Sequence, residues 1–101
     1  MWNRVAIKEV TVANPQGLHA RPADAFARLA NQFVSVIDVV KEGQRVNGKS
    51  ILDLLMLAAE EGTVLIIEAR GDDAEDAIEA LGRLMEQVNS YDEGMKSSRN
   101  Q

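Results

Sequence analysis

The chain has 101 residues, 46% of them hydrophobic and 27% charged, and this length and composition predict a single globular domain. It contains no cysteine, which excludes disulfides and thiol catalysis. With only one histidine as well, we expect neither a metal nor a cofactor. The formal net charge of −5 predicts no binding to nucleic acid, although seven basic against five acidic residues give positions 1–59 a positive balance.

The N-terminal segment predicts a strand and no targeting sequence. Residues 1–12 mix charged with apolar residues, so they lack the apolar centre of a signal peptide. No apolar run in the chain approaches the length of a membrane span. We therefore expect a cytoplasmic protein without membrane insertion. Residues 5–12 are β-branched and roughly alternating, and they predict the first strand.

The next segment predicts a turn, a helix and a hairpin. Asn-Pro-Gln-Gly at 14–17 is typical of a turn, and an apolar stripe with helical spacing follows over 21–33. Residues 34–40 predict a second strand. A tight turn at 41–44 then predicts a short return strand over 45–47.

Ser50 marks the predicted start of a second helix. A serine followed three positions later by Asp53 is typical of a helix N-terminus, with the serine as N-cap. The sequence predicts that this helix is short and ends near Glu61 and Gly62.

The last third of the chain predicts a strand, a long helix and a tail. Residues 63–69 are strongly apolar and predict a strand. Asp72 and Glu75 have the spacing of a capping box that opens a long helix. From residue 94 the composition is polar and aperiodic, so we expect a flexible polar tail over 94–101.

The order of these elements predicts the fold class. Strand, helix, strand, strand, helix, strand, helix (βαββαβα) suits an α+β domain over residues 1–93, with a four-stranded antiparallel sheet and helices on one face. Many small domains share this pattern, so it does not fix a function by itself.

The only histidine, His19, lies in the stretch Gly-Leu-His-Ala-Arg-Pro-Ala at 17–23. Gly17 permits a tight turn, and Pro22 suits the first turn of a helix. These two residues place His19 at the cap position, directly before the first helical turn. A histidine at a helix start can also be purely structural, so the spacing alone leaves its role open.

The residues after His19 suit an anion held on the imidazole. The N–H groups of a first helical turn have no acceptors within the helix, and Ala20 and Arg21 belong to that turn. Their backbone N–H groups therefore face a bound phosphate at the positive end of the helix dipole. The guanidinium of Arg21 adds planar donors that match phosphate oxygens.

The stretch at 17–23 resembles the active-centre signature of the HPr family, the histidine-containing phosphocarriers of the bacterial phosphoenolpyruvate-dependent sugar phosphotransferase system. Val-Asn-Gly-Lys-Ser-Ile-Leu at 46–52 is similar to the family's second signature, which surrounds a regulatory serine. The resemblance extends over about residues 3–90. It implies the family's open-faced β-sandwich, with four antiparallel strands covered by three helices.

The resemblance also implies a relay. Enzyme I, charged from phosphoenolpyruvate, would pass a phosphoryl group to Nδ1 of His19, and His19 would pass it to an enzyme II A domain. Arg21 would stabilise the phosphate. The chain would then be a phosphoryl carrier in sugar uptake and not an enzyme that turns over alone, since it shows no metal set, second base or nucleotide loop.

Ser50 has a structural and a regulatory interpretation. As an N-cap it would contribute about 1 kcal/mol to stability. The resemblance implies that it is also phosphorylated by an HPr kinase/phosphorylase, and that a transcription regulator can then bind. A phosphate at a helix N-terminus is electrostatically tolerated, so it would change the docking of partners and would not unfold the helix.

The helix after Ser50 is the expected docking surface. It is too short to bury all of its apolar residues, so some of them must face solvent or a partner. The expected docking residues are Ile51, Leu52 and Leu55, with basic contacts from Arg28, Arg45 and Lys49.

Two residues near His19 depart from the expected pattern. Gln16 stands where the family often has a smaller polar residue, which affects how the loop before His19 is fixed. Asp24 brings negative charge into what we expect to be the first turn of the helix, where it favours the helix dipole and opposes a nearby phosphate.

Three alternatives to sugar transport stay open. The chain can be an HPr-like protein of a regulatory or nitrogen-related phosphotransfer branch, which uses the same His19 chemistry. It can be a binding module controlled through Ser50 alone, or a ligand-binding domain with an incidental histidine. We expect a monomer in each case.

Overall fold

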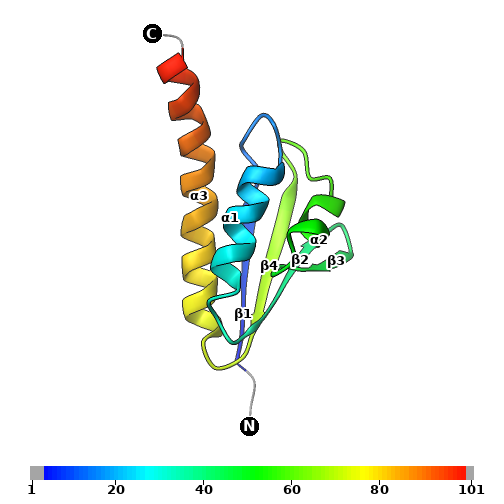
Figure 1. The fold of residues 1–101 in the computed structure, drawn as a ribbon. Helices are drawn as coiled ribbons and strands as arrows, with labels where there is room; N and C mark the ends of the chain where they lie inside the picture. Colours follow the sequence, from blue (N-terminus) through cyan, green and yellow to red (C-terminus); the bar gives the residue numbers. More distant parts are fainter. Residues whose placement is uncertain (1–3, 100–101) are drawn as a thin grey trace.

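The described part of the chain forms one antiparallel sheet and three helices (Figure 1). The computed structural model describes residues 4–99 and the side chains of residues 4–88, so the ends of the predicted domain and tail lie outside it. The strands are β1 (Val5–Thr11), β2 (Val36–Lys41), β3 (Gln44–Asn47) and β4 (Val64–Arg70). The helices are α1 (Ala20–Ala30), α2 (Ile51–Met56) and α3 (Ala74–Arg99). The strand order across the sheet is β1-β4-β2-β3.

Alternating side chains give the sheet a covered and an open face. In the central strand β4, Leu65, Ile67 and Ala69 are buried, while Ile66 and Glu68 point to the other side. The helices lie on the side of the buried residues (Figure 1). The predicted α+β class, with the order βαββαβα and helices on one face, is therefore confirmed.

The core fills the space between the sheet and the helices, and Leu54 is the buried residue of α2. The buried residues of α1 are Pro22, Ala23, Phe26, Ala27 and Ala30. Those of α3 are Ala74, Ala77, Leu81, Gly82 and Met85. An enclosed cavity among the core side chains measures only ≈ 10 Å³, which is about the minimum space for one water molecule.

A two-residue turn closes the hairpin of β2 and β3. Glu42 and Gly43 both have positive φ, 47° and 85°, as the tight turn of a two-residue hairpin requires. Val39 pairs with Val46 across the hairpin. The predicted hairpin is confirmed, and β3 is one residue longer than expected because Gln44 pairs with Lys41.

Asp73 joins the start of α3 to the start of β2. Its carboxylate accepts hydrogen bonds from the N–H groups of Val34 (2.9 Å) and Ser35 (3.0 Å) and from the Ser35 hydroxyl. Its carbonyl accepts the first helical bond of α3, from the N–H of Ala77 at 2.9 Å. Because these bonds occupy Val34 and Ser35, β2 begins at Val36, two residues later than the sequence predicts.

Helix α3 begins one residue later than the predicted capping box of Asp72 and Glu75 implies. Asp73, and not Asp72, is the residue before the first helical position Ala74. The Ser35 hydroxyl, followed by the backbone N–H groups, holds the pKa of the Asp73 carboxyl below its ordinary value. Local spacing could not reveal this, because the donors are 38 and 39 residues away in the chain, before the neighbouring strand β2.

Helix α2 ends earlier than the sequence predicts. It closes at Met56, with Leu57 as C-cap, because Ala58 takes a positive φ of 49° that no helix can contain. The ammonium of Lys41 donates to the carbonyl of Leu57 at 2.9 Å and stabilises the end of the helix. Where the helix ends, the chain direction changes, and the side chains of Leu57 and Ala59 are buried in the core.

Helix α3 continues to Arg99, past residue 93 where the sequence analysis ends the domain. The residues after Gly94 are good or average helix formers, so local propensity does not stop the helix there. The helical assignment does not test the flexibility predicted for the segment 94–101, which stays a prediction. No helix in the described part of the chain is both long and apolar enough to cross a membrane.

Replacing Asp73 with asparagine is expected to destabilise the protein most at neutral pH. The pKa of Asp73 is lowered in the folded state, so its stabilising effect is present above the ordinary value of about 4 and is lost as the pH falls through the folded value. Urea unfolding of wild type and Asp73→Asn from neutral to strongly acidic pH measures this. The two curves should converge in acid, while Asp72→Asn, a change at an exposed neighbour, should follow wild type throughout. A difference that stays constant with pH would contradict the assignment.

Candidate functional site

His19 is the N-cap of α1. Its backbone is extended (φ −88°, ψ −172°), and its carbonyl accepts the first helical bond from the N–H of Ala23 at 3.1 Å. Pro22 lies in the first turn, where a missing N–H removes no helical bond. The predicted cap position is therefore confirmed, and the imidazole stands at the positive end of the helix dipole.

The loop before His19 is fastened to the segment that follows α2. The N–H of Leu18 donates to the carbonyl of Ala59 at 2.8 Å. Gly17 lies directly against the same carbonyl, since a Cβ at this position would stand 2.5 Å from the Ala59 oxygen. Gly17 also has a φ of +73°, so both its backbone conformation and its surroundings require glycine. Leu18 is buried and anchors the loop in the core.

Asn14 is a site residue that the sequence analysis missed. It is only 3% exposed, and its side-chain nitrogen Nδ2 lies 3.2 Å from Nε2 of His19. Its Oδ1 accepts from the N–H of Gln16 at 3.0 Å, and its carbonyl accepts from the N–H of Gly17 at 2.8 Å. The dipeptide Asn-Pro predicts a turn, but it does not predict the direction of the asparagine side chain or its contact with the histidine.

Gln16 therefore takes part in the loop through its backbone. Its side chain is exposed, and its N–H is held by Asn14. The loop is thus fixed by the asparagine and the glycine, and the larger side chain at position 16 has room in solvent.

Arg21 and Ala20 lie in the first turn of α1, and both are exposed beside His19. The phosphate-binding role of Arg21 and of the two backbone N–H groups stays a prediction. Asp24 lies past the first turn, which contains no acidic residue, so its expected position was wrong. Its carboxylate pairs with Nε of Arg28 at 3.0 Å, an i,i+4 pair that balances the negative charge near His19.

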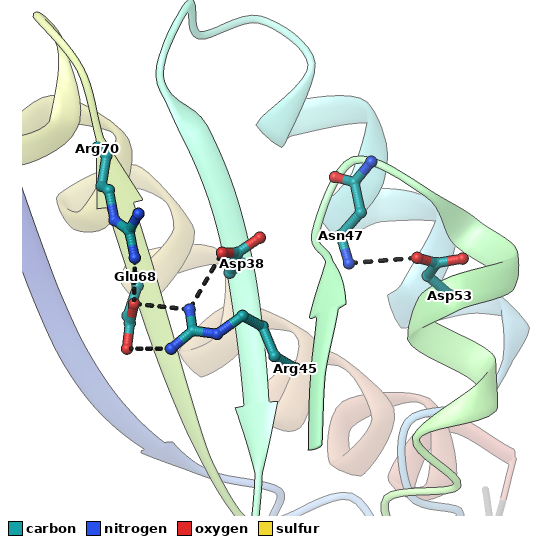
Figure 2. A network of polar contacts seen from close by, with 6 residues as sticks. All are labelled: Asp38, Arg45, Asn47, Asp53, Glu68 and Arg70. Atoms are coloured by element: carbon teal, nitrogen blue, oxygen red, sulfur yellow. Dashed lines mark hydrogen bonds and ion pairs between the residues drawn. The ribbon is translucent and has the colours of Figure 1, made fainter. Parts of the chain in front are cut away.

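Ser50 caps α2 as predicted. Its hydroxyl accepts from the N–H of Asp53 at 3.2 Å. The Asp53 carboxylate reaches back to the N–H of Asn47 at 3.3 Å (Figure 2). The N–H of Ser50 donates to the carbonyl of Asn47 at 3.2 Å. These bonds fix the turn that presents Ser50 half-exposed at the helix start.

Lys49 ties the end of α1 to the start of α2. Its ammonium donates to the carbonyl of Phe33 at 2.7 Å, and its own carbonyl accepts from the side-chain amide of Asn31 at 3.0 Å. A partner carboxylate would have to share this ammonium with Phe33. Arg28, whose side chain is 78% exposed, is the more accessible of the predicted docking cations.

Exposed apolar side chains of α2 form a patch, which we call the α2 patch. It consists of Ile51, Leu52 and Met56, with exposed fractions of 37%, 73% and 69%. Leu55, the third expected docking residue, is half-buried and packs against the core, while Met56 was missed. Because Ala59 bonds to the histidine loop, the end of α2 lies next to that loop.

Arg45 does not belong to the docking surface. It lies on the open face of the sheet, where its guanidinium contacts Glu68 at 2.8 Å and Asp38 at 3.0 Å (Figure 2). Glu68 is also paired with Arg70 at 3.6 Å. Hydrogen bonds to Glu68 and Asp38 raise the pKa of Arg45, and Arg45 in turn lowers the pKa of Glu68. The expectation for Arg45 was wrong because strand alternation places it opposite the helices.

Comparison with known proteins finds one family over most of the chain. The family model described as "PTS HPr component phosphorylation site", where PTS is the phosphotransferase system, matches residues 6–87. This range includes the histidine loop, α1, α2 and most of α3.

Similar proteins and structures agree with this match. Phosphocarrier protein HPr of Neisseria meningitidis serogroup B is 44% identical over 84 residues, which cover 83% of this chain and 91% of that protein. HPr-like protein Crh of Halalkalibacterium halodurans is 43% identical over 74 residues, covering 73% and 88%. The solved structure of the histidine-containing phosphocarrier protein of Mycoplasma superposes with a TM-score of 0.81 at 34% identity, covering 83% of this chain and 96% of that one.

Replacing Gly17 with alanine is expected to destabilise the protein more than the same change at Gly43. Both glycines have positive φ, +73° and +85°, but only Gly17 has a neighbour that the new methyl group would overlap. We expect the free energy of unfolding to fall by about 1–3 kcal/mol more in Gly17→Ala than in Gly43→Ala, as for overpacking of a tight site. Urea denaturation of the two variants measures the difference, and equal losses would show that the contact with Ala59 is unimportant.

Proposed function

Since the chain belongs to the HPr family of phosphotransferase-system phosphocarriers, we propose that His19 is the residue that carries the phosphoryl group. The observation that carries the proposal is the position of the only histidine. His19 is the N-cap of a helix, on a surface loop fixed by Gly17 and Ala59. An anion on this imidazole is next to first-turn N–H groups and the positive end of a dipole.

The proposed transfer is a substitution at phosphorus. Phosphorylated enzyme I is the donor, with phosphoenolpyruvate as the original source. The lone pair of Nδ1 of His19 forms a bond to phosphorus as the bond from phosphorus to the donor's leaving group breaks. The ring proton, which lies on Nε2 in the reacting tautomer, passes through solvent to the leaving group. An enzyme II A domain then accepts the phosphoryl group by the reverse chemistry, so the carrier returns unchanged.

The chain's own groups would hold the phosphoryl group and would not perform a catalytic cycle. The guanidinium of Arg21, two residues from His19, supplies donors with the geometry of phosphate oxygens. The first-turn N–H groups supply partial positive charge. The proposal involves no metal or organic cofactor, and it makes the protein a carrier that is modified and restored and not an enzyme that turns over alone.

The α2 patch is the proposed docking surface for enzyme I and enzyme II A domains. The three exposed apolar side chains lie on the helix whose end adjoins the histidine loop, and they suit a transient interface with an apolar centre. Arg28, exposed on α1, suits an acidic partner. The carrier is proposed to act as a monomer in the cytoplasm.

Ser50 is the proposed regulatory phosphorylation site, recognised by an HPr kinase/phosphorylase. It lies at the N-terminal end of the helix that carries the α2 patch. A phosphate there adds negative charge next to an apolar surface without removing the start of the helix. It would weaken docking of acidic partners and allow a transcription regulator to bind.

A second candidate function is a regulatory or nitrogen-branch role. The similarity to HPr-like protein Crh, almost as high as to the Neisseria carrier, favours it. The chemistry at His19 would be the same, and only the partners would differ.

Labelling with phosphoenolpyruvate and enzyme I is expected to modify His19 alone. Wild type and Ser50→Ala should gain one acid-labile phosphate each, and His19→Ala should gain none, because a phosphorus–nitrogen bond is broken by acid. Intact-mass spectrometry before and after acid treatment measures this. An unlabelled wild type beside phosphorylated cognate enzyme I would contradict the carrier function.

Two substitutions at Ser50 are expected to separate its two roles. Ser50→Asp keeps a capping oxygen and adds charge, so it should retain stability but slow phosphoryl transfer from enzyme I. Ser50→Ala removes the cap without adding charge, so it should cost about 1 kcal/mol of stability and leave transfer nearly unchanged. Thermal unfolding and the rate of transfer measure the pair. Equal transfer rates in the two variants would exclude a regulatory charge effect at this position.

A further inference from the structure

The contact between Asn14 and His19 joins a buried amide to the ring that carries the proposed chemistry. Asn14 is one of the buried polar residues of the described chain, at 3% exposure. Its Nδ2 lies 3.2 Å from Nε2 of His19, within hydrogen-bond distance. A buried amide of this kind holds its orientation, because an unpaired amide group would be costly.

The orientation of this amide follows from its second partner. The N–H of Gln16 donates to the side-chain oxygen of Asn14 at 3.0 Å. Turning the amide over would place its NH₂ group against this N–H, two donors facing each other. The oxygen therefore faces Gln16, and the NH₂ group faces His19.

The orientation decides which state of the imidazole fits the loop. An NH₂ group is a donor, so Nε2 can accept its hydrogen bond only while Nε2 carries no proton. In the neutral ring the single proton then lies on Nδ1. We propose that Asn14 is a positioning residue that keeps Nε2 of His19 unprotonated in the resting ring and in the phosphorylated ring. The contact then has to open when enzyme I docks, so that the ring proton moves from Nδ1 to Nε2 and the lone pair of Nδ1 can attack.

The same contact would protect the phosphorylated ring. This step rests on the proposed function, with the phosphoryl group on Nδ1. The bond from Nδ1 to phosphorus breaks more readily when Nε2 is protonated, because the neutral imidazole is then the leaving group. An amide that donates to Nε2 disfavours that proton, so it lengthens the lifetime of the phosphorylated carrier in water. A partner that breaks the contact on docking would release the protection where transfer takes place.

The first test is the protonation of the ring in the unphosphorylated protein. Because His19 is the only histidine, nitrogen-15 NMR of histidine-labelled protein reports its two ring nitrogens without overlap. At a pH where the ring is neutral, wild type should carry the proton on Nδ1. Asn14→Ala should show a population with the proton on Nε2.

The variant Asn14→Asp provides a sharper version of this test. A carboxylate still accepts from the N–H of Gln16, so the loop keeps that bond. Its other oxygen is an acceptor facing Nε2, which should move the proton from Nδ1 to Nε2. Gln16→Ala is the matched control, since it leaves the backbone N–H in place and removes an exposed side chain. It should behave as wild type.

The second test is the lifetime of the phosphorylated protein after enzyme I is removed. Losing one hydrogen bond of this kind predicts hydrolysis roughly threefold to tenfold faster in Asn14→Ala than in wild type or Gln16→Ala. Intact-mass spectrometry over time measures the decay. Two-dimensional NMR of each variant shows that the fold is retained.

The outcomes separate this inference from the proposed function. Wild type with its proton on Nε2, or Asn14 variants that match wild type in protonation, would overturn the inference even if His19 is phosphorylated normally. Equal lifetimes would overturn its second part. A wild type that enzyme I never phosphorylates would overturn the proposed function and the lifetime part together, while the protonation test would still decide the role of Asn14.

Discussion

The hydrogen bond from Leu18 to the carbonyl of Ala59, with Gly17 packed against the same carbonyl, is the contact on which the site depends. It joins the loop that carries His19 to the segment after α2, although the two are far apart in the chain. The segment in turn takes its shape from the early end of α2, where Ala58 has positive φ and Lys41 binds the last carbonyls. The histidine is thus held by the same turn that ends the proposed docking helix.

This arrangement places the three parts of the proposed site on one side of the molecule. Backbone hydrogen bonds connect the histidine loop, which leads into α1, to the segment that follows α2. At the other end of the two helices, Lys49 links the C-terminal end of α1 to the N-terminal end of α2. Ser50 begins the helix whose end supports the histidine loop. A charge placed on Ser50 would therefore act on docking through the shared surface and need not reach His19 directly. The ionic cluster around Arg45 lies on the open face and has no part in this surface (Figure 2).

Local signals in the sequence predicted most of the fold. The hairpin turn at Glu42 and Gly43, the cap at Ser50 and the cap position of His19 all follow from residues next to one another. The features that were missed depend on contacts between distant elements. The delayed start of β2 needs Asp73, and the early end of α2 is supported by the distant ammonium of Lys41. Asn14 and His19 are close in sequence, but the direction of the asparagine side chain is set by the folded loop.

The central claim is that the loop presents Nδ1 of His19, and not Nε2 or Ser50, to the phosphoryl donor. Phosphorus-31 and nitrogen-15 NMR of wild-type protein, phosphorylated by enzyme I and phosphoenolpyruvate, tests it most directly. The account predicts one phosphorus signal, coupled to Nδ1 of the single histidine. A phosphoryl group on Nε2 or on Ser50, or no phosphoryl group at all, would contradict it.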